Sequence, residues 1–221
     1  VREIYDTIIR DNICGPAGKP VRIEMFAHGA LCMAISGKCY LSLHAYGASA
    51  NRGACYQICR RGYEVTDLET GNKLDIENKY IMSPKDLCTI EFMDKIINAG
   101  VKVFKIEGRA RSAEYVKRCA QCYRAAADAV CEGRYTPELA GKLKDSLSEV
   151  FNRGFWDGYY QGAYLGQWSE VYGSQAKLKK VYVGKVTNWF DKIGVAEILV
   201  ESAPLQKGDK VMGIGQTTGV E

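Results

Sequence analysis

The chain has 221 residues and a formal net charge of +4, from 30 Lys and Arg against 26 Asp and Glu. Hydrophobic residues make up 47% and charged residues 25%, a balance that is typical of folded domains and excludes a disordered chain. A charge of +4 is too small to argue for a nucleic-acid partner by itself. No stretch approaches the ~18 consecutive apolar residues of a membrane span, and the N-terminus does not resemble a signal peptide. We therefore expect a cytoplasmic protein.

The first quarter of the chain predicts two regular elements followed by irregular backbone. Residues 1–12 place isoleucines at helical spacing and predict a short amphipathic helix. Residues 21–26 alternate apolar and polar side chains, which predicts a strand. Residues 28–63 are rich in Gly, Cys and small side chains without a sustained period. This composition indicates backbone that wraps around a bound group.

The middle of the chain has the pattern of an α/β protein. Ser83-Pro84-Lys85-Asp86 has the composition of a helix start, which predicts a helix from there to Gly100. Residues 101–106 predict a buried strand, and further helices are expected after Ser112 and Thr136. Alternation of helix, strand and helix favours the α/β class. The apolar stripe expected on the helix after Ser112 consists of Val116, Cys119, Ala120, Tyr123, Ala127 and Val130.

The C-terminal quarter changes in composition. Residues 151–168 combine glycines with aromatic residues, including Tyr164, and we expect these rings to fill a gap between domains rather than to stack on bases. Strands are predicted at residues 181–187, 194–201 and 210–214. We therefore expect an α/β region with a Cys-rich loop over residues 1–168. A small and incomplete β domain is expected over residues 169–221.

The nine cysteines are the chain's most informative feature. An odd number without a secretory signal favours reduced thiols or metal ligands over disulfides. Four cysteines fall in the glycine-rich stretch, and four thiolates complete either a zinc site or a [4Fe–4S] cluster. A zinc ribbon prefers two CxxC-like knuckles, and these are absent here. The spacing of the cysteines therefore mildly favours the cluster. Four buried small hydrophobic side chains are the alternative interpretation. The four cysteines are Cys32, Cys39, Cys55 and Cys59.

The remaining cysteines give weaker signals. Cys88 lies on the helix predicted from Ser83 and is a candidate substitute ligand. Cys119 and Cys122 form a CxxC motif, but inside a predicted helix rather than at a helix N-terminus after a strand. That position argues against a redox-active pair.

Several segments resemble the peptidase U32 family, which is also called collagenase-like. The first and most specific is residues 24–32 (EMFAHGALC), followed by residues 37–42 (GKCYLS) and 53–60 (GACYQICR). The resemblance continues through residues 82–87 (MSPKDL) and 105–109 (KIEGR). The β-rich tail, with LQKGDKV at residues 205–211, looks like the small barrel appended to these proteins. A weaker likeness links the tail to barrels of translation factors.

The resemblance implies a fold, a cofactor and a reaction class. Members resemble TIM-type barrels, and several bind a [4Fe–4S] cluster through cysteines placed like Cys32, Cys39, Cys55 and Cys59. Some members hydroxylate the wobble uridine of tRNA, and others act on ribosomal RNA or in oxygen-independent ubiquinone synthesis. The peptidase name carries no assigned catalytic type. Because a TIM barrel takes ~250 residues, we expect this chain to be a partial barrel that lacks its N-terminal half, followed by a small β-barrel-like domain.

The first functional hypothesis is an iron–sulfur enzyme of RNA modification with tRNA as its partner. Because function gathers at the C-terminal ends of barrel strands, we expect His28, Glu107 and Arg109 to face one site as catalytic candidates. Pairing of Glu107 and Arg109 with each other, or with Lys85 and Asp86, is the alternative. Basic residues near the motifs are candidates for phosphate contacts, or else belong to a solvated helix face with internal salt bridges. These basic residues are Arg60, Arg61, Arg111 and Lys117.

Two further hypotheses remain open. A protease would take peptide substrates, but HExxH and GxSxG motifs are absent and only His28 or His44 can serve Ser42 or Cys32 as a base. A cysteine that ligates a cluster cannot also be a free nucleophile. The third hypothesis is a non-catalytic interaction module stabilised by a metal, for which zinc serves equally well.

Overall fold

The computed structural model describes residues 1–32, 34, 38–74, 82–109, 111–163, 166–171, 173–215 and 219–220. Gly37 of the second motif and Tyr164 of the aromatic segment lie outside these residues. The chain divides into two compact units, Val1–Ala176 and Lys177–Glu221. Among the described residues, no helix has the length and apolar character needed to cross a membrane.

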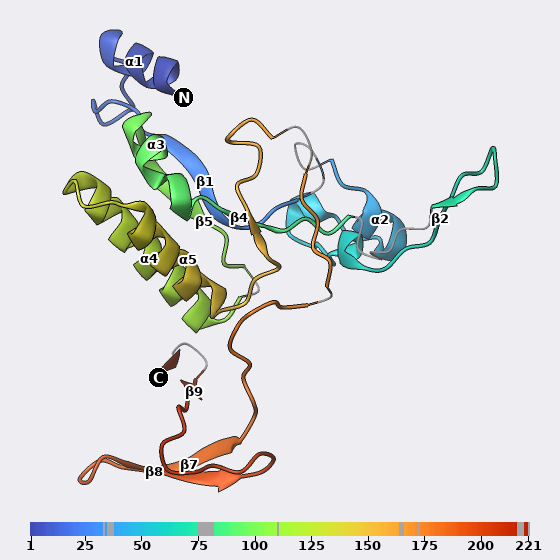
Figure 1. Cartoon of the computed structure of the whole chain (residues 1–221), viewed down its shortest axis with the longest axis vertical. Helices are drawn as coiled ribbons and strands as arrows, with labels where there is room; N and C mark the ends of the chain where they lie inside the picture. Colours follow the sequence, from blue (N-terminus) through green and yellow to red (C-terminus); the bar gives the residue numbers. More distant parts are fainter. Residues whose placement is uncertain are drawn as a thin grey trace. The chain divides into compact units, whose positions relative to one another are not determined.

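The first unit mixes helices and strands, as expected for the α/β class (Figure 1). Its α-helices are α1 (Arg2–Arg10), α2 (Leu41–Tyr46), α3 (Met93–Asn98), α4 (Ala113–Cys131) and α5 (Pro137–Ser148). Its strands are β1 (Ile23–Ala30), β2 (Val65–Thr66), β3 (Lys73–Leu74), β4 (Asp86–Cys88), β5 (Val101–Ile106) and β6 (Phe155–Trp156). Its 3₁₀ turns are η2 (Ala50–Arg52), η3 (Ile58–Arg60) and η4 (Ile90–Phe92).

The central sheet has the strand order β5-β1-β4-β6. β1 is parallel to β5 and antiparallel to β4, and β4 is parallel to β6. The antiparallel pair brings His28 opposite Cys88 and Ala30 opposite Asp86. The sheet is open, and no closed barrel is found in the described part of the chain. The mixed α/β class is therefore confirmed, whereas the barrel is not.

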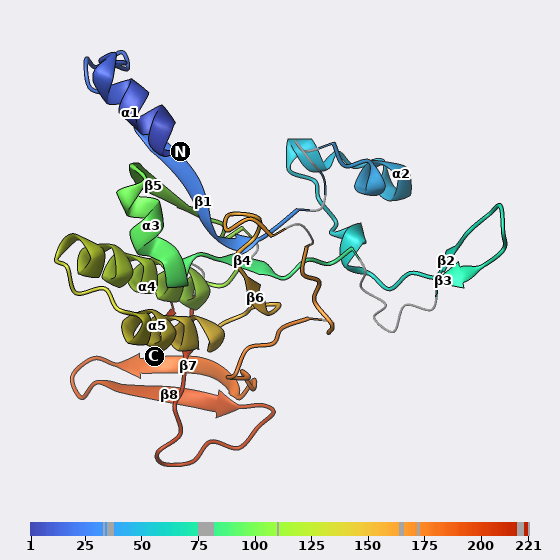
Figure 2. The same ribbon diagram turned by 45° about the horizontal axis from the view of Figure 1, so that its top comes forward.

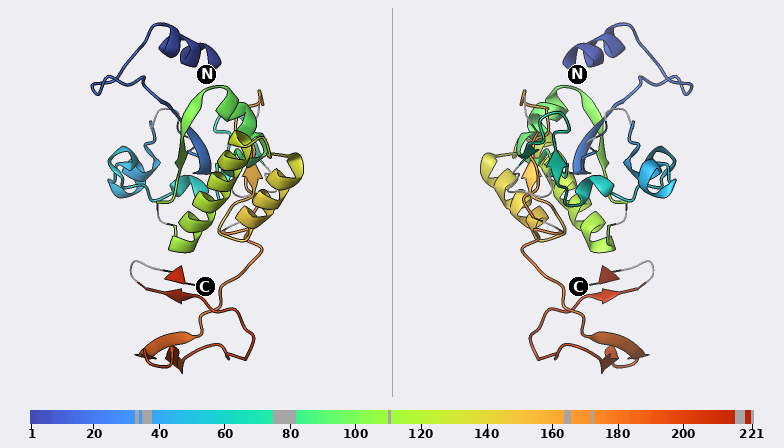
Figure 3. Two further views of the ribbon diagram at one scale, coloured as in Figure 1. Left: turned by 90° about the vertical axis from the view of Figure 1, so that its left-hand side faces the viewer. Right: turned by 90° about the vertical axis from the view of Figure 1, so that its right-hand side faces the viewer.

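Helices α3, α4 and α5 pack together beside the sheet (Figures 1 and 3). The core between them and the sheet joins Ala27 of β1 and Val101 of β5 to the buried face of α4. That face differs from the predicted stripe, since Val116 is 44% exposed and Ala120 is also exposed. The difference arises because Tyr115 and the CxxC cysteines pack inward as apolar groups. The buried residues of α4 are Tyr115, Cys119, Cys122, Tyr123, Ala126 and Ala129.

The helix predicted from Ser83 to Gly100 is wrong. Asp86 lies in β4, and only residues 93–98 form the α-helix α3. The reason is tertiary: the Asp86 amide donates to the Gly154 carbonyl at 2.9 Å, and the Asp86 carboxylate accepts from the Arg153 amide at 3.2 Å. Because the Asp86 carboxylate is bonded to Arg153, it does not stabilise the start of a helix at this position. Thr136 does cap α5 as expected, because its Oγ1 accepts from the Leu139 amide at 3.2 Å.

Residues 38–74 form an arm that extends from the central sheet (Figure 2). It contains α2, η2, η3 and the short antiparallel pair of β2 and β3. Much of this arm is irregular backbone, as the glycine-rich composition indicates. We call it the cysteine arm, because it carries Cys39, Cys55 and Cys59.

The second unit consists of two antiparallel pairs. One pair joins β7 (Gly184–Phe190) and β8 (Val195–Val200), and the other joins β9 (Gly213–Ile214) and β10 (Gly219–Val220). The strands lie within or near the predicted segments. No closed barrel is found among the described residues of this unit either. Val186, Trp189 and Leu199 of the first pair are 54–60% exposed, so the pair buries little of its apolar surface.

Gly29 lies where β1 approaches the end of β5 most closely. Its φ is +121°, and a Cβ built there would lie 2.8 Å from the Glu107 carbonyl oxygen. The same contact fixes the two strand ends, because the Glu107 amide donates to the His28 carbonyl at 2.9 Å. Only glycine fits this position without moving backbone.

We expect Gly29→Ala to lower the free energy of unfolding by about 3 kcal/mol, from backbone strain and overpacking together. Gly133→Ala is the matched control, since Gly133 also has a positive φ (+69°) but nothing lies within 4 Å of the added Cβ. The control should cost about 1 kcal/mol. Urea unfolding of both variants measures the difference, and equal losses would contradict the close approach.

Candidate functional site

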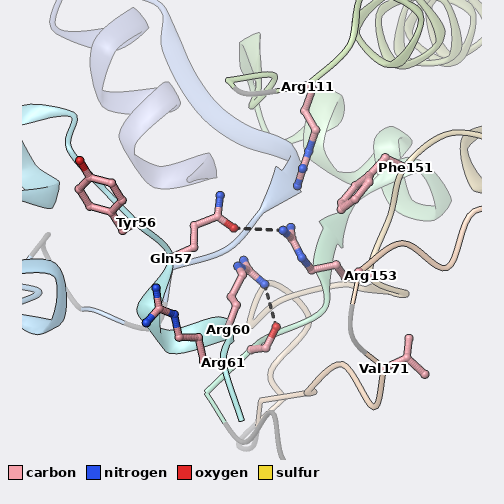
Figure 4. A pocket seen from close by; sticks show the side chains of 10 residues that line it. Tyr56, Gln57, Arg60, Arg61, Arg111, Phe151, Arg153 and Val171 are labelled. Atoms are coloured by element: carbon pink, nitrogen blue, oxygen red, sulfur yellow. Dashed lines mark hydrogen bonds between the residues drawn. The ribbon is translucent and has the colours of Figure 1, made fainter. Parts of the chain in front are cut away.

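A pocket of about 430 Å³ lies where the cysteine arm meets the loops that follow β5 and α5 (Figure 4). Four of its lining side chains are arginines and none is acidic. Arg60, Arg111 and Arg153 direct their guanidinium groups toward a common space, whereas Arg61 turns away from it. We call this the arginine pocket. Its lining residues are Tyr56, Gln57, Arg60, Arg61, Ser83, Arg111, Phe151, Arg153, Val171 and Gly173.

The carboxylate of Asp86 is the buried counter-charge of these arginines. Its side chain is 2% exposed and pairs with the Arg153 guanidinium at 3.4 Å. Burial raises the pKa of Asp86, and the positive charges of Arg153, Arg111 and Arg60 oppose that rise. One carboxylate therefore interacts with three arginines at once.

Arg153 is held between this carboxylate and the cysteine arm. Its Nη2 donates to Gln57 Oε1 at 3.1 Å. Burial lowers the pKa of Arg153 to about 10, and the repulsion of Arg60 and Arg111 adds to the effect against the attraction of Asp86. Arg153 is therefore repelled by two neighbouring arginines and attracted by one carboxylate.

Arg60 acts as a structural clamp. Its Nη1 donates to Ser83 Oγ at 3.0 Å and to the Pro84 carbonyl at 3.2 Å, and its Nη2 donates to the Leu31 carbonyl at 3.0 Å. These bonds join the cysteine arm to the ends of β1 and to the residues before β4. Most of the donor capacity of Arg60 is used in this way.

Arg111 is held by aromatic rings instead. Its guanidinium lies 3.9 Å from the Phe151 ring centroid and 5.7 Å from that of Tyr115. Arg153 also lies over Phe151, at 5.0 Å, so one ring supports two cations. Within the described part of the chain, the Arg111 guanidinium makes no hydrogen bond or ion pair. Its N–H donors are therefore available to a ligand.

The structure brings together some of the basic residues predicted from the sequence and separates others. Arg60, Arg61 and Arg111 all line the pocket, although Arg61 donates to the Tyr46 hydroxyl at 2.7 Å. Lys117 is exposed on α4 and does not line it. Arg153 is not among the candidates from the sequence, because residues 151–168 predict aromatic rings that fill a gap between domains. A basic residue inside a segment rich in glycine and aromatic residues is the signal that could have identified it.

The four cysteines predicted as ligands, Cys32, Cys39, Cys55 and Cys59, are neighbours, and we call them the loop thiols. Burial raises the pKa of the Cys59 thiol, Arg60 opposes the rise, and the other three thiols add to it. Among the described residues, no group of three or more His, Cys, Asp or Glu side chains takes up a metal-ligating arrangement. The donor set fits a thiolate-held group in its chemistry, and the ligand assignment stays a prediction.

The catalytic candidates lie side by side but differ in exposure. His28 lies within β1 and Glu107 directly follows the parallel strand β5, and the Glu107 amide donates to the His28 carbonyl. Glu107 Oε1 accepts from the Arg109 amide at 2.7 Å, and Arg109 is exposed. His28 is only 1% exposed, and its ring packs against Tyr115, Tyr123 and Phe155. Their catalytic roles stay predictions.

The sequence predicts Cys88 on a helix, and this is wrong. Cys88 lies in the buried strand β4. Burial raises the pKa of its thiol to about 11, and its hydrogen-bonding neighbours include the Tyr123 hydroxyl. This environment is that of a core side chain. Cys119 and Cys122 are likewise buried in α4, which agrees with the argument against a redox pair.

Comparisons with known proteins give a family match and several relatives. A family model described as peptidase family U32 matches residues 9–169. A collagenase of Porphyromonas gingivalis is 61% identical over 220 residues, covering 100% of this chain and 53% of its own length. The tRNA hydroxylation protein P1 of Bacillus subtilis is 34% identical over 201 residues, covering 88% of this chain and 47% of its own length.

A third relative, a 23S rRNA 5-hydroxycytidine synthase of Escherichia coli, is 40% identical over 150 residues, covering 65% of this chain and 22% of its own length. The chain thus spans about half the length of the collagenase and of the tRNA hydroxylation protein. No solved structure matches the chain significantly.

We expect Asp86→Asn to lower the free energy of unfolding by about 3 kcal/mol, because it leaves the buried Arg153 without its counter-charge. The double variant Asp86→Asn/Arg153→Gln should recover part of this loss. Asp128→Asn is the control, since it breaks an exposed pair with Arg124 and should have a much smaller effect. Urea unfolding measures all three, and an equal loss in the control and the Asp86 variant would contradict the role of Asp86.

His28 predicts a pH dependence of stability. Burial lowers its pKa from 6.5 to about 4, so the folded ring stays neutral while the unfolded chain takes up a proton below pH 6.5. The free energy of unfolding therefore falls as the pH falls through this window. Between pH 7.5 and pH 5, the wild type should lose about 2 kcal/mol more than His28→Gln.

The comparison of the wild type with His28→Gln isolates the effect of His28, because Asp86 is present in both proteins. The raised pKa of Asp86 makes the free energy of unfolding change with pH in the opposite direction. The phenols of Tyr115 and Tyr123 and the thiol of Cys88 have raised pKa values and stay neutral over this range. A histidine NMR titration gives the pKa directly, with the signal of the exposed His44 for reference. Protonation of His28 near pH 6.5 would contradict the prediction.

Proposed function

The chain belongs to peptidase family U32, and from this membership we propose that the whole protein is an iron–sulfur enzyme that modifies RNA in the cytoplasm. The reaction class is the hydroxylation named for its tRNA- and rRNA-modifying relatives. The resemblance found in the sequence is confirmed at the level of the family. Family membership does not specify which reaction the whole protein performs, and that reaction is what we propose.

The observation that carries the proposal is that the segment of the loop thiols also lines the arginine pocket. Arg60 follows Cys59 directly, and its guanidinium binds the Leu31 carbonyl, next to Cys32. The thiols therefore stand beside a cationic pocket. Arginines without an acidic partner on the pocket wall suit a polyanion, and RNA phosphates are the anions that such groups position.

The loop thiols would hold the cluster. Four thiolates complete the ligand set of a [4Fe–4S] cluster, which supplies one-electron chemistry when bound. Zinc would use the same four donors and would serve a structural role instead. The identity of the bound metal therefore distinguishes the two hypotheses. An iron–sulfur cluster would favour the enzyme, and zinc would favour the non-catalytic module.

A peptidase is the second candidate, because the relative named collagenase is 61% identical. Of the four groups that the sequence offers for hydrolysis, Ser42 and His28 are buried, whereas Cys32 and His44 are exposed. Ser42 is 1% exposed and its Oγ accepts from the Tyr56 amide at 3.1 Å, while His28 is buried among aromatic rings. The burial of Ser42 and His28, together with the proposed use of Cys32 as a cluster ligand, favours RNA modification over peptide hydrolysis.

Replacing any one of the loop thiols by Ser should lower the iron and sulfide content of anaerobically purified protein by more than half, because each removes a cluster ligand. Cys131→Ser is the matched control, since Cys131 is also exposed but lies at the end of α4. Metal analysis of all five variants measures the effect. One zinc and no iron in the wild type would favour the structural site.

The same variants test the reaction in cells. A strain that lacks the gene should lose a hydroxylated pyrimidine from its tRNA or rRNA, as seen by mass spectrometry of nucleosides. The wild type and Cys131→Ser should restore it, whereas Cys55→Ser should not. Unchanged nucleosides, together with gelatin cleavage by the purified protein, would reject RNA modification in favour of the peptidase.

A further inference from the structure

We propose that the arginine pocket is a binding site for a single phosphate group, held by Arg111 and Arg153. The inference rests on the proposed function only for the source of that group, which we take to be the RNA backbone. The site itself follows from the charge, the free donors and the size of the pocket.

The wall of the pocket, as formed by the described residues, carries four positive charges and no negative one. Four arginines line it, and the carboxylate that compensates them, Asp86, lies behind the wall with its side chain 2% exposed. Burial together with neighbouring cations lowers the pKa of Arg153 to about 10. An anion placed between Arg153 and Arg111 would relieve this repulsion, because a nearby negative charge favours the protonated form.

The arginines divide into those that build the pocket and those that can bind. The guanidinium of Arg60 donates to Ser83 Oγ and to the carbonyls of Pro84 and Leu31, and that of Arg61 donates to the Tyr46 hydroxyl. The guanidinium of Arg111 has no hydrogen bond or ion pair among the described residues, and only its backbone amide is bonded, to the Gly108 carbonyl at 3.0 Å. Its planar fork of donors matches the oxygens of a phosphate, which favours two parallel hydrogen bonds.

Phe151 positions the two binding cations. Its ring centroid lies 3.9 Å from the Arg111 guanidinium carbon and 5.0 Å from that of Arg153. The ring restricts both side chains without using their N–H donors, so little conformational entropy is lost when a ligand binds. Phe151 therefore preorganises the site.

The pocket is larger than one phosphate. A volume of about 430 Å³ leaves room for the sugar or base attached to it. Tyr56, which is 59% exposed, also lines the pocket and presents an aromatic ring. These features suit a phosphate that belongs to a nucleotide rather than an inorganic ion alone.

The test compares Arg111→Gln with Arg124→Gln in the anaerobically purified, reduced protein. Both variants remove one arginine charge, but Arg124 is exposed on α4 and pairs with Asp128. Calorimetry with inorganic phosphate, uridine 5′-monophosphate and citrate measures small anions, and fluorescence anisotropy measures a single-stranded oligoribonucleotide. We expect Arg111→Gln to raise the Kd of phosphate and of the nucleotide about 10-fold or more. The control should stay within about twofold of the wild type.

A second measurement needs no variant. Phenylglyoxal modifies accessible arginines, and peptide mapping locates the modified positions. Phosphate should protect Arg111 from modification in the wild type and leave Arg124 unprotected. This readout stands even where Arg111→Gln does not fold.

The outcomes separate the pocket from the proposed function. Phosphate and RNA binding that both depend on Arg111 support both ideas. Phosphate binding without RNA binding supports the pocket and removes RNA as the source of the group. RNA binding that is unchanged in Arg111→Gln overturns the pocket and leaves the proposed function intact. Tighter binding of citrate than of either phosphate probe, or no protection of Arg111, also overturns the phosphate site.

Discussion

The buried carboxylate of Asp86 is the point on which the surrounding structure depends. It accepts from the Arg153 amide and guanidinium, and its own amide binds the Gly154 carbonyl, so the segment after α5 is fastened to β4. Arg60 and Arg111 add electrostatic attraction from two other segments. An ionised group inside a protein is costly unless it is paired. The need to pair this carboxylate therefore draws distant parts of the chain to one place.

The fold was predictable where the signals are local. Thr136 precedes a proline and caps α5 through its own side chain, and residues 101–106 form β5 because a short apolar run between turns suits a buried strand. Asp86 misled the prediction, since its suitability for a helix N-terminus was overridden by Arg153, a partner far along the chain. The antiparallel pairing of β1 with β4 has the same non-local origin. No window of sequence around either strand contains it.

The candidate site divides in the same way. The loop thiols stood out because four cysteines fall in one glycine-rich stretch, and Arg60 and Arg111 because they adjoin recognisable motifs. Arg153 and Phe151 do not stand out in the sequence, since their contribution arises where the segment after α5 packs on β4. The burial of His28 was also hidden, because the aromatic residues that enclose it come from α4 and β6. A ligand site is a property of converging segments, whereas sequence patterns report one segment at a time.

Gln57 links the loop thiols to the arginine pocket. It stands between Cys55 and Cys59 with a left-handed backbone (φ +52°), and its side chain accepts from Arg153. A residue other than glycine holds that conformation only where its surroundings compensate the strain. A ligand that drew Arg153 away would relax the backbone between two cysteines, and a ligand on the cysteines would in turn fix Arg153. The two places would then be coupled through Gln57, and such a coupling free energy would be the same in each direction.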